Sequence, residues 1–244
     1  MNQSVSYRFI CITFFLTIFV IPSLFSAETA TTPPPPTKTP PEGFVSLFDG
    51  KTLSGWEGSS KFWSVENGCI TGRSSIENPV PYSTYLVWQG KPVGDFTLLL
   101  DFCIVEGNSG IEYRAWKDSE RENGLNGYQA DISAGDIMGI LYGEALGEII
   151  AWRGESVRFA RDGAKTIEKF GDAQEIGKSI KMNGWNTYQI EANGNKFVEY
   201  INNVKTSELT DERECSPQQG IFGLQIHPGP PMFFQFKNIF LQER

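Results

Sequence analysis

The sequence contains a single histidine, His227, and only four cysteines, which are scattered along the chain. Neither residue type occurs in the paired CxxC or HxxxH spacing of zinc sites, so a Cys/His zinc site of the usual kind is excluded. Lysine and arginine number 21 against 29 acidic residues, a formal charge of −8, and no stretch gathers the basic residues into a stripe. A nucleic-acid partner is therefore not expected. Any metal would have to be held mainly by oxygen ligands.

Hydrophobic residues make up 40% of the 244 positions and aromatic residues 13%. This content is enough to fill a core, and it excludes intrinsic disorder of the whole chain. The length suits one large β domain or two small ones.

Residues 1–27 have the pattern of an export signal. Arg8 precedes an uncharged, apolar run from Phe9 to Ile21, and small residues follow between Ser23 and Ala27. The run is shorter than the ~20 residues that a membrane-spanning helix needs, which favours cleavage and an exported protein, periplasmic or extracellular. The alternative is an uncleaved segment that anchors the chain in a membrane. No membrane contact is expected apart from such a segment.

Residues 28–42 are rich in proline and threonine, which predicts a stiff, polyproline-like linker before a domain that spans 43–244. Removal of the signal leaves three cysteines, so at least one thiol is free in an oxidising compartment. Cys69 and Cys103 lie in strand-like segments and are able to pair. We favour the interpretation that both are small buried hydrophobic residues.

Short strands separated by Gly, Asn and Asp turns fill the sequence from Gly43 to Arg244. Helical periodicity is nearly absent, so the pattern predicts an all-β domain, an antiparallel β-sandwich of the jelly-roll type. The charged, glycine-dotted stretch 154–182 indicates a surface excursion with a short strand at Ser156–Phe159. The other expected strands are Phe62–Val65, Cys69–Thr71, Tyr85–Trp88, Phe96–Val105, Gly110–Ala115, Gly127–Ile132, Thr187–Ala192, Lys196–Ile201, Gly220–Ile226 and Met232–Leu241.

Three of these strands each place two polar side chains on the face away from the core, because residues i and i+2 of a strand point the same way. A solvated outer face alternates in the same manner, and for one strand alone that explanation is the more frequent one. The three segments contain neither lysine nor serine, however, which favours a binding or catalytic site. The pairs are Glu112 with Arg114, Gln129 with Asp131, and Gln225 with His227.

Aromatic residues offer a second kind of candidate. Most of the six tryptophans are expected to pack in the core or at its edges. Trp116 and Trp152 lie in loop-like surroundings and are the better candidates for stacking on sugar rings.

Several separate motifs follow one another along the chain. They are Phe48-Asp49-Gly50-Lys51-Thr52-Leu53-Ser54-Gly55-Trp56, Gly94-Asp95-Phe96-Thr97-Leu98, Gly107-Asn108-Ser109-Gly110-Ile111, Gly127-Tyr128-Gln129-Ala130-Asp131-Ile132, Asn183-Gly184-Trp185-Asn186-Thr187-Tyr188 and Leu224-Gln225-Ile226-His227-Pro228-Gly229-Pro230-Pro231. In this order they resemble the 3-keto-disaccharide hydrolase domain family. The resemblance runs from about Gly43 to the last residues and implies a concanavalin A-like sandwich of two curved antiparallel sheets, in agreement with the strand pattern.

The resemblance implies an enzyme that cleaves glycosides whose sugar has first been oxidised to a 3-ketone. A ketone at C3 acidifies the C2 proton, so that a base removes it, the enolate expels the C1 substituent, and water adds to the enone. This reaction needs a general base, groups that stabilise the enolate oxygen, and an acid for the leaving oxygen.

Within this resemblance His227 is the expected base, because imidazole changes its charge near neutral pH. Arg114 is expected to stabilise negative charge on O3, and Asp131 to orient the imidazole or act as the acid. A divalent cation bound by Asp131, Glu112 and His227, acting as a Lewis acid, is an alternative that the sequence leaves open. Further substrate-binding candidates are Glu112, Gln129, Gln225, Trp116, Trp152 and, in a stretch that matches the family more loosely, Tyr142 and Glu144.

Two other functions compete with this one. A lectin-like module that binds carbohydrate without catalysis would suit the same fold. A retaining glucanase would need two carboxylates about 5–5.5 Å apart, and no strand here carries such a pair on one face. We rank keto-glycoside cleavage first, the binding module second and direct hydrolysis third.

Overall fold

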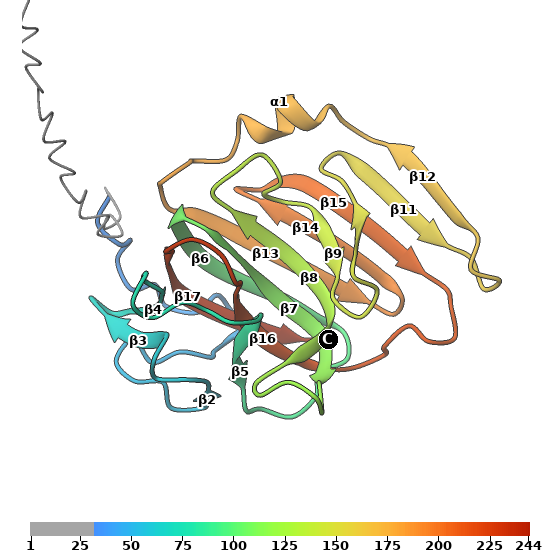
Figure 1. The fold of residues 1–244 in the computed structure, drawn as a ribbon. Coiled ribbons are helices and arrows are strands. Elements are labelled where there is room, and N and C mark those ends of the chain that lie inside the picture. The colour runs from blue at the N-terminus through green and yellow to red at the C-terminus, as the bar shows by residue number, and fades with distance from the viewer. Residues whose placement is uncertain (1–31) are drawn as a thin grey trace, which may run out of the picture.

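The structure, a computed structural model, describes residues 32–244, and the predicted export signal lies outside them. Two sheets pack face to face (Figure 1). The one helix among these residues, α1 (Ala173–Gly177), is short and lies at the edge of the sandwich. Both sheets are built almost entirely from antiparallel strands, so the predicted all-β sandwich is confirmed. Within residues 32–244 no helix is long and apolar enough to cross a membrane.

The large sheet has ten strands in the order β12-β11-β15-β14-β13-β6-β17-β4-β3, with β1 paired to β17. One pair departs from the antiparallel expectation, because β11 runs parallel to β15. The strands are β1 (Val45–Ser46), β3 (Trp63–Glu66), β4 (Cys69–Arg73), β6 (Phe96–Glu106), β11 (Glu155–Phe159), β12 (Lys165–Lys169), β13 (Asn186–Asn193), β14 (Lys196–Ile201), β15 (Val204–Asp211) and β17 (Phe233–Glu243).

The small sheet has seven strands in the order β10-β9-β8-β7-β16-β5-β2, and its neighbours all run antiparallel. One face packs on the large sheet, and the other carries the site described below. The strands are β2 (Trp56–Glu57), β5 (Thr84–Trp88), β7 (Asn108–Lys117), β8 (Leu125–Ser133), β9 (Leu141–Gly143), β10 (Glu148–Ala151) and β16 (Ile221–Ile226).

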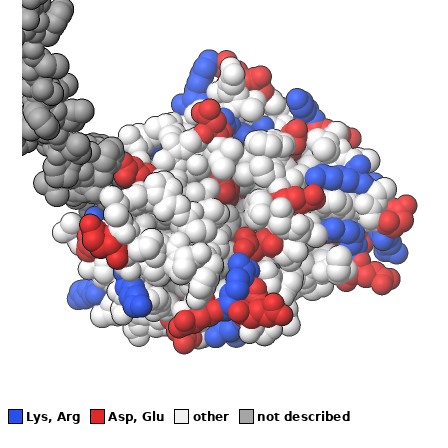
Figure 2. Space-filling view, in the orientation of Figure 1, with Lys and Arg blue, Asp and Glu red and all other residues white. Residues whose placement is uncertain are grey.

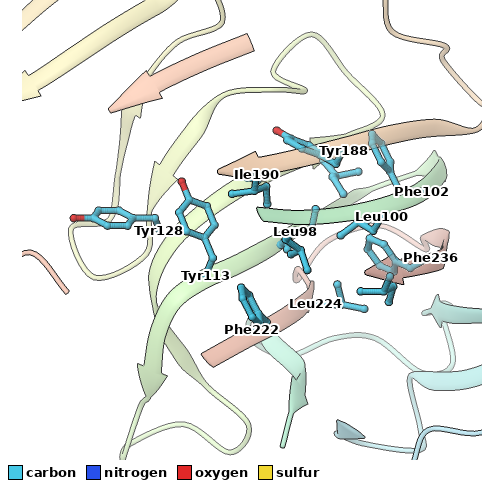
Figure 3. Close-up of a cluster of buried hydrophobic side chains, with 14 of the residues drawn as sticks. Leu98, Leu100, Phe102, Tyr113, Tyr128, Tyr188, Ile190, Phe222, Leu224 and Phe236 are labelled. Carbon is cyan, nitrogen blue, oxygen red and sulfur yellow. The ribbon is translucent and has the colours of Figure 1, made fainter. Parts of the chain in front are cut away.

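The core lies between the sheets and is rich in aromatic rings from both of them (Figure 3). Phe96 of the large sheet meets Phe222 of the small sheet edge to face, with ring centroids 4.9 Å apart. Tyr128 and Phe197 also meet across the sheets, in a tilted arrangement with ring centroids 4.6 Å apart. Such pairs add to the stabilisation from burial alone, and they explain why the inward positions of the strands are so strongly aromatic.

The expected strands all form, with boundaries shifted by at most two residues. The excursion at 154–182 contains the predicted short strand as β11, and also β12 and α1. Strands β1, β2, β9, β10 and β15 were not predicted. The first four are only two to four residues long, and β15 carries Lys205, Glu208 and Thr210 among its residues, so that it resembles a loop. The interpretation of Cys69 and Cys103 as buried hydrophobic residues is confirmed, since both thiols are free and buried.

The predicted linker contacts the domain at its C-terminal end. The backbone N–H of Lys38 donates to Asn238 Oδ1 at 3.0 Å, and its ammonium lies 2.8 Å from the Asp101 carboxylate. Asn238 also donates to the carbonyl of Pro36 at 3.2 Å. Residues 36–38 therefore lie on the large sheet rather than extending away from it.

Candidate active site

A pocket of about 370 Å³ lies over the outer face of the small sheet. Strands β7, β8, β9 and β16 and the loop between β8 and β9 supply its walls, so it is built from the most extensively paired part of that sheet. Six of the predicted site residues line it. The lining residues are Ser83, Asn108, Gln129, Asp131, Ile137, Ile140, Tyr142, Glu144, Ile149, Gln225 and His227.

One position on the floor of the pocket is a glycine, and the side chain of Gln129 occupies the space above it. Gly110 of β7 pairs with Asp131 of β8. The register of β16 on β7 places Gln225 on the other side of Gly110. Asp131 and Gln225 therefore stand two strand spacings apart, about 10 Å, with no side chain between them at the level of the sheet. A Cβ at Gly110 would lie 2.5 Å from Cδ of Gln129, whose side chain leans over this gap.

Asp131 is almost completely buried at the pocket, with 4% of its surface exposed. Its Oδ2 accepts one long hydrogen bond, 3.5 Å, from Nδ2 of Asn108, and its Oδ1 has no hydrogen-bond partner within residues 32–244. Burial raises the pKa of Asp131 to about 8, against a small opposing effect of Asn108. At neutral pH this carboxyl is therefore mostly protonated and able to donate a proton.

Glu112 lies beneath the pocket rather than on its surface. Nε2 of Gln129 donates to its Oε1 at 2.9 Å and covers it, so that Glu112 is fully buried. The other oxygen, Oε2, has no partner in the described part of the chain. Burial, and next the nearby charge of Glu144, raise the pKa of Glu112 well above its ordinary value. Its position makes Glu112 a support for Gln129.

Gln225 completes the polar floor. Its Nε2 donates to the hydroxyl of Tyr85 at 3.1 Å, while its Oε1 is buried without a partner among the described residues. Burial raises the pKa of Tyr85, so its hydroxyl stays neutral. Buried polar atoms are nearly always hydrogen-bonded in folded proteins. Two unpartnered oxygens on residues that line one pocket, Asp131 and Gln225, therefore indicate hydrogen-bonding capacity that a polar ligand would use.

His227 stands at the exposed rim of the pocket, just after β16. Its Nδ1 lies 2.6 Å from the carbonyl oxygen of Pro228. A carbonyl only accepts, so Nδ1 carries the hydrogen of this contact, and the neutral ring then has its lone pair on Nε2. The turn that begins at Pro228 thus fixes the ring in the tautomer that a general base needs.

Tyr142 and Glu144 form the wall opposite His227, on and just after β9. Glu144 accepts a hydrogen bond from Arg121 Nη1 at 3.1 Å, which holds the wall against the loop that follows β7. Burial is the main reason why the pKa of Tyr142 is raised, and the neighbouring acids Glu144, Glu112 and Asp131 add to it. The Tyr142 hydroxyl is therefore a neutral donor at the pocket surface.

The prediction that Arg114 shares this face is wrong. Arg114 has a positive φ of 48°, and the pairing of β7 with β8 is irregular between Tyr113 and Trp116, so the strict alternation of the strand is broken there. The guanidinium is completely buried and crosses to the large sheet, where it donates to Asp95 Oδ1 at 2.9 Å and lies over the Phe197 ring. Arg114 joins the two sheets and does not line the pocket.

Neither predicted tryptophan platform lines this pocket. Trp116 is 46% exposed and borders a separate hollow of about 280 Å³, on the far side of the turn that follows β9. Trp152 is 50% exposed and follows β10. Apart from Tyr142, the apolar side chains that line the pocket are aliphatic, from Ile137, Ile140 and Ile149.

The carboxylates and the imidazole are not gathered as metal ligands. Across residues 32–244 no three His, Cys, Asp or Glu side chains lie close enough together to hold an ion. Gln129 covers Glu112. Asp131 lies two residues after Gln129 on β8, and His227 lies at the rim of the pocket. The set of Asp131, Glu112 and His227 that the sequence suggested for a cation therefore does not fit one.

The sequence-based prediction missed two groups of residues at the site. Tyr85 and Arg121 support the pocket, and Ser83, Asn108, Ile137, Ile140 and Ile149 line it. Asn108 shares its strand face with Gly110 and Glu112, so extending the alternation by one step would have found it. Tyr85 pairs with Gln225 in the register of β5 and β16, and no local pattern reveals that pairing. Arg121 lies in an irregular loop without any strand signal.

Charged side chains are interspersed over the molecular face drawn in Figure 2, and acidic groups alternate with basic ones there. The strongest charge effects at the pocket are those of its own acids. A neutral, hydroxyl-rich ligand suits such a site better than an anion, because an anion would meet Glu144 and the partly ionised Asp131.

Residues 43–242 match the profile of the 3-keto-alpha-glucoside-1,2-lyase-like domain. The chain belongs to this family. A curated relative from Bacteroides thetaiotaomicron, named 3-keto-disaccharide hydrolase, is 31% identical over 93 residues, which are 35% of this chain and 32% of the relative. The match therefore spans about a third of the length of that relative.

Solved structures agree with the family in fold. Two crystal structures of candidate glycosyl hydrolases from Parabacteroides distasonis superpose with TM-scores of 0.54 and 0.53, each at 18% identity. The first covers 82% of this chain and 99% of the other, and the second covers 83% and 94%. At this identity the likeness concerns the sandwich alone.

Proposed function

We propose that this protein cleaves 3-keto-glycosides in the pocket over β7, β8, β9 and β16, by proton abstraction at C2, elimination at C1 and addition of water. The family and the named relative support a sugar as the substrate. The geometry supports the individual steps, each of which is assigned below to a group at the pocket.

In the first step Nε2 of His227 takes the C2 proton, and the electrons of the C–H bond form an enolate with the C3 ketone. The Nδ1 contact with the carbonyl of Pro228 keeps Nε2 unprotonated in the neutral ring. The hydroxyl of Tyr142 donates to the developing negative charge on O3. This donor takes the role that was expected of Arg114, and donors placed where charge develops are worth several kcal/mol in such reactions.

In the second step the enolate collapses to the enone, the bond from C1 to the leaving oxygen breaks, and Asp131 protonates that oxygen. A general acid must hold its proton at the working pH, and a carboxyl with a pKa of about 8 does so. Water then adds to C1 and gives a proton to the Asp131 carboxylate, while the imidazolium returns its proton to C2. The net reaction consumes one water, and both residues return to their starting states.

The observation that carries this proposal is the Asp131 carboxyl, buried at the pocket with one oxygen unpartnered and a pKa near 8. Direct hydrolysis by two carboxylates is less well supported. It would need a second carboxylate beside the sugar. Glu112 is fully buried under Gln129, and Glu144 on the pocket wall is paired with Arg121.

The decisive measurement compares monosaccharide release from a 3-keto-disaccharide with release from its unoxidised parent. We expect release from the keto sugar only. Replacement of His227 by Ala should lower turnover by at least ~10²-fold, the low end for loss of a general base, without a change in melting temperature, because the side chain is exposed.

A Gln218→Ala variant, which changes an exposed side chain outside the pocket, serves as the control and should keep full activity. Unchanged turnover in His227→Ala would show that the imidazole is not the base. Release from the unoxidised parent would point to direct hydrolysis, and binding of the keto sugar without any release would point to a lectin-like module.

We also propose that the domain works outside the cytoplasm, because residues 1–27 have the pattern of an export signal. The amino-terminal residue of protein recovered from the periplasm or medium tests this point. A chain that begins near Ala27 is expected, and retention of Met1 in a membrane fraction would indicate an anchor.

A further inference from the structure

We infer that the leaving group of the substrate is apolar, and that it binds in a second hollow next to the active-site pocket. This hollow has a volume of about 510 Å³. The inference rests on the proposed function, since the leaving group is defined by the cleavage reaction. The lining residues are Ile76, Val105, Glu106, Gly107, Ala134, Pro230 and Pro231.

Three chain segments pass from the polar pocket directly into the apolar hollow. Asn108 lines the pocket and its neighbour Gly107 lines the hollow. Asp131 on β8 lines the pocket, and Ala134, just after β8, lines the hollow. The N–H of Ala134 donates to the Gly107 carbonyl at 3.1 Å. The turn after β16 carries His227 on the pocket side and the two prolines on the other.

The position of Asp131 gives the direction in which a bound glycoside points. The acid must lie at the bond that breaks, so the group attached to C1 extends past Asp131. Asn108 contacts Asp131 at 3.5 Å on that side, and Gly107 immediately precedes Asn108 in the chain. Beyond Asp131, a leaving group therefore enters the space between Gly107, Ala134 and Pro230.

The chemistry of the hollow differs from that of a sugar subsite. Its side chains are those of Ile76, Val105, Ala134 and the two prolines, and Glu106 is its one charged residue. A second sugar would leave most of its hydroxyl groups facing aliphatic carbon, and unpaired polar groups are costly to bury. Ile76 is 69% exposed and would gain contact area by covering an apolar ring. The structure thus favours a cycloalkyl or aryl leaving group.

The test compares two 3-keto-glucosides with alcohol leaving groups, a cyclohexyl glycoside and a disaccharide, each prepared as both anomers. Alcohol leaving groups keep the intrinsic reactivities close, which a phenol would not. We expect kcat/KM for the cyclohexyl glycoside to exceed that for the disaccharide. An Ile76→Asp variant should lower the cyclohexyl value by about tenfold, the low end of discrimination by a hydrophobic pocket, and change the disaccharide value less than about twofold.

Ile167→Asp is the matched control, because Ile167 is another exposed isoleucine, 53% accessible, on β12, and it lines neither hollow. It should leave both substrates unchanged. Equal losses for both substrates in Ile76→Asp, or a wild-type protein that prefers the disaccharide, would overturn the inference.

A binding measurement separates this inference from the proposed reaction. Calorimetric titration with the cyclohexyl 3-keto-glucoside should show weaker binding to Ile76→Asp than to the wild type. If neither glycoside is cleaved but this selective loss of binding is seen, the proposed reaction is wrong and the apolar subsite stands. If both are cleaved and the variant binds as tightly as the wild type, the subsite is wrong and the reaction stands.

Discussion

Two buried acids, one in the core and one at the pocket, meet the same cost of burial in different ways. Glu199 of β14 is fully buried between the sheets, and Asp131 of β8 is almost fully buried at the pocket. Burial raises the pKa of each to about 8. The protein surrounds the first with hydrogen-bond donors and leaves the second nearly without them.

Three hydroxyl groups donate to the Glu199 carboxyl. The hydroxyl of Tyr113 lies 3.0 Å from Oε1, that of Ser207 lies 2.8 Å from Oε2, and that of Tyr188 lies 3.3 Å from Oε2. Figure 3 shows Tyr113 and Tyr188 reaching into the core from opposite sheets. This acid ties the two sheets together, whereas the open oxygen of Asp131 is available to a ligand. Burial and a raised pKa therefore do not identify a site by themselves; unpartnered atoms at a cavity do.

The largest effect that tests the comparison of Glu199 with Asp131 is the loss of stability when Glu199 is replaced. Glu199→Ala should lower the free energy of unfolding by at least about 3 kcal/mol, because it leaves three buried hydroxyl donors without their acceptor and opens a cavity. This corresponds to a fall in Tm of about 6–12 °C for a domain of this size. The measurement is thermal unfolding followed by circular dichroism.

Glu208→Ala on the adjacent strand β15 is the control, since Glu208 pairs with Lys196 and Lys205 near the surface and such pairs contribute little. Activity per folded molecule of Glu199→Ala should stay within a fewfold of wild type. A stable Glu199→Ala protein that has lost its activity would reverse the roles that we give to the two acids.

The sequence predicts those parts of this arrangement whose pattern lies in neighbouring residues. Strand alternation is local, so the shared face of Gln129 and Asp131 and the outward position of Gln225 were predicted correctly. The same rule failed at Arg114, because a bulge interrupts the alternation and the left-handed backbone of this residue turns its side chain inward.

Contacts between distant strands carry no local signal at all. Glu199 meets Tyr113 across 86 positions of the sequence, and Tyr85 meets Gln225 across 140. Both acids of the comparison lie on strands that alternate normally, so the sequence alone does not tell which one the fold surrounds with donors. Only the pairing of strands decides that.

The second prediction concerns activity at the other acid. Asp131→Asn should lower the cleavage of a 3-keto-disaccharide by at least ~10²-fold, the low end for loss of a general acid, because the amide has no proton to give to the leaving oxygen. Steady-state kinetics at pH 7 measure it. The same substitution at exposed Asp136, in the loop after β8, is the control and should have no effect. Wild-type kinetics in Asp131→Asn would remove this carboxyl from the reaction.

The smallest effect expected is a dependence of stability on pH. The pKa of Asp131 is raised from 3.8 to about 8 on folding. The folded protein therefore binds more protons than the unfolded chain between these values, and this group makes the protein less stable as the pH rises through that window. Asp131→Asn lacks the contribution. At pH 8 the variant should be at least about 1 kcal/mol more stable than the wild type, a Tm higher by about 2–4 °C.

The difference in Tm between Asp131→Asn and the wild type should shrink as the pH falls towards 4 and should approach zero below about pH 3, where the aspartate is protonated in both the folded and the unfolded state. Glu199 is present in both proteins, so its own titration cancels from the difference. A Tm difference that stays constant from pH 4 to pH 8 would mean that Asp131 is ionised normally in the folded state. Asp131 would then be a hydrogen-bond acceptor for the sugar rather than the acid, and the comparison with Glu199 would rest on hydrogen bonding alone.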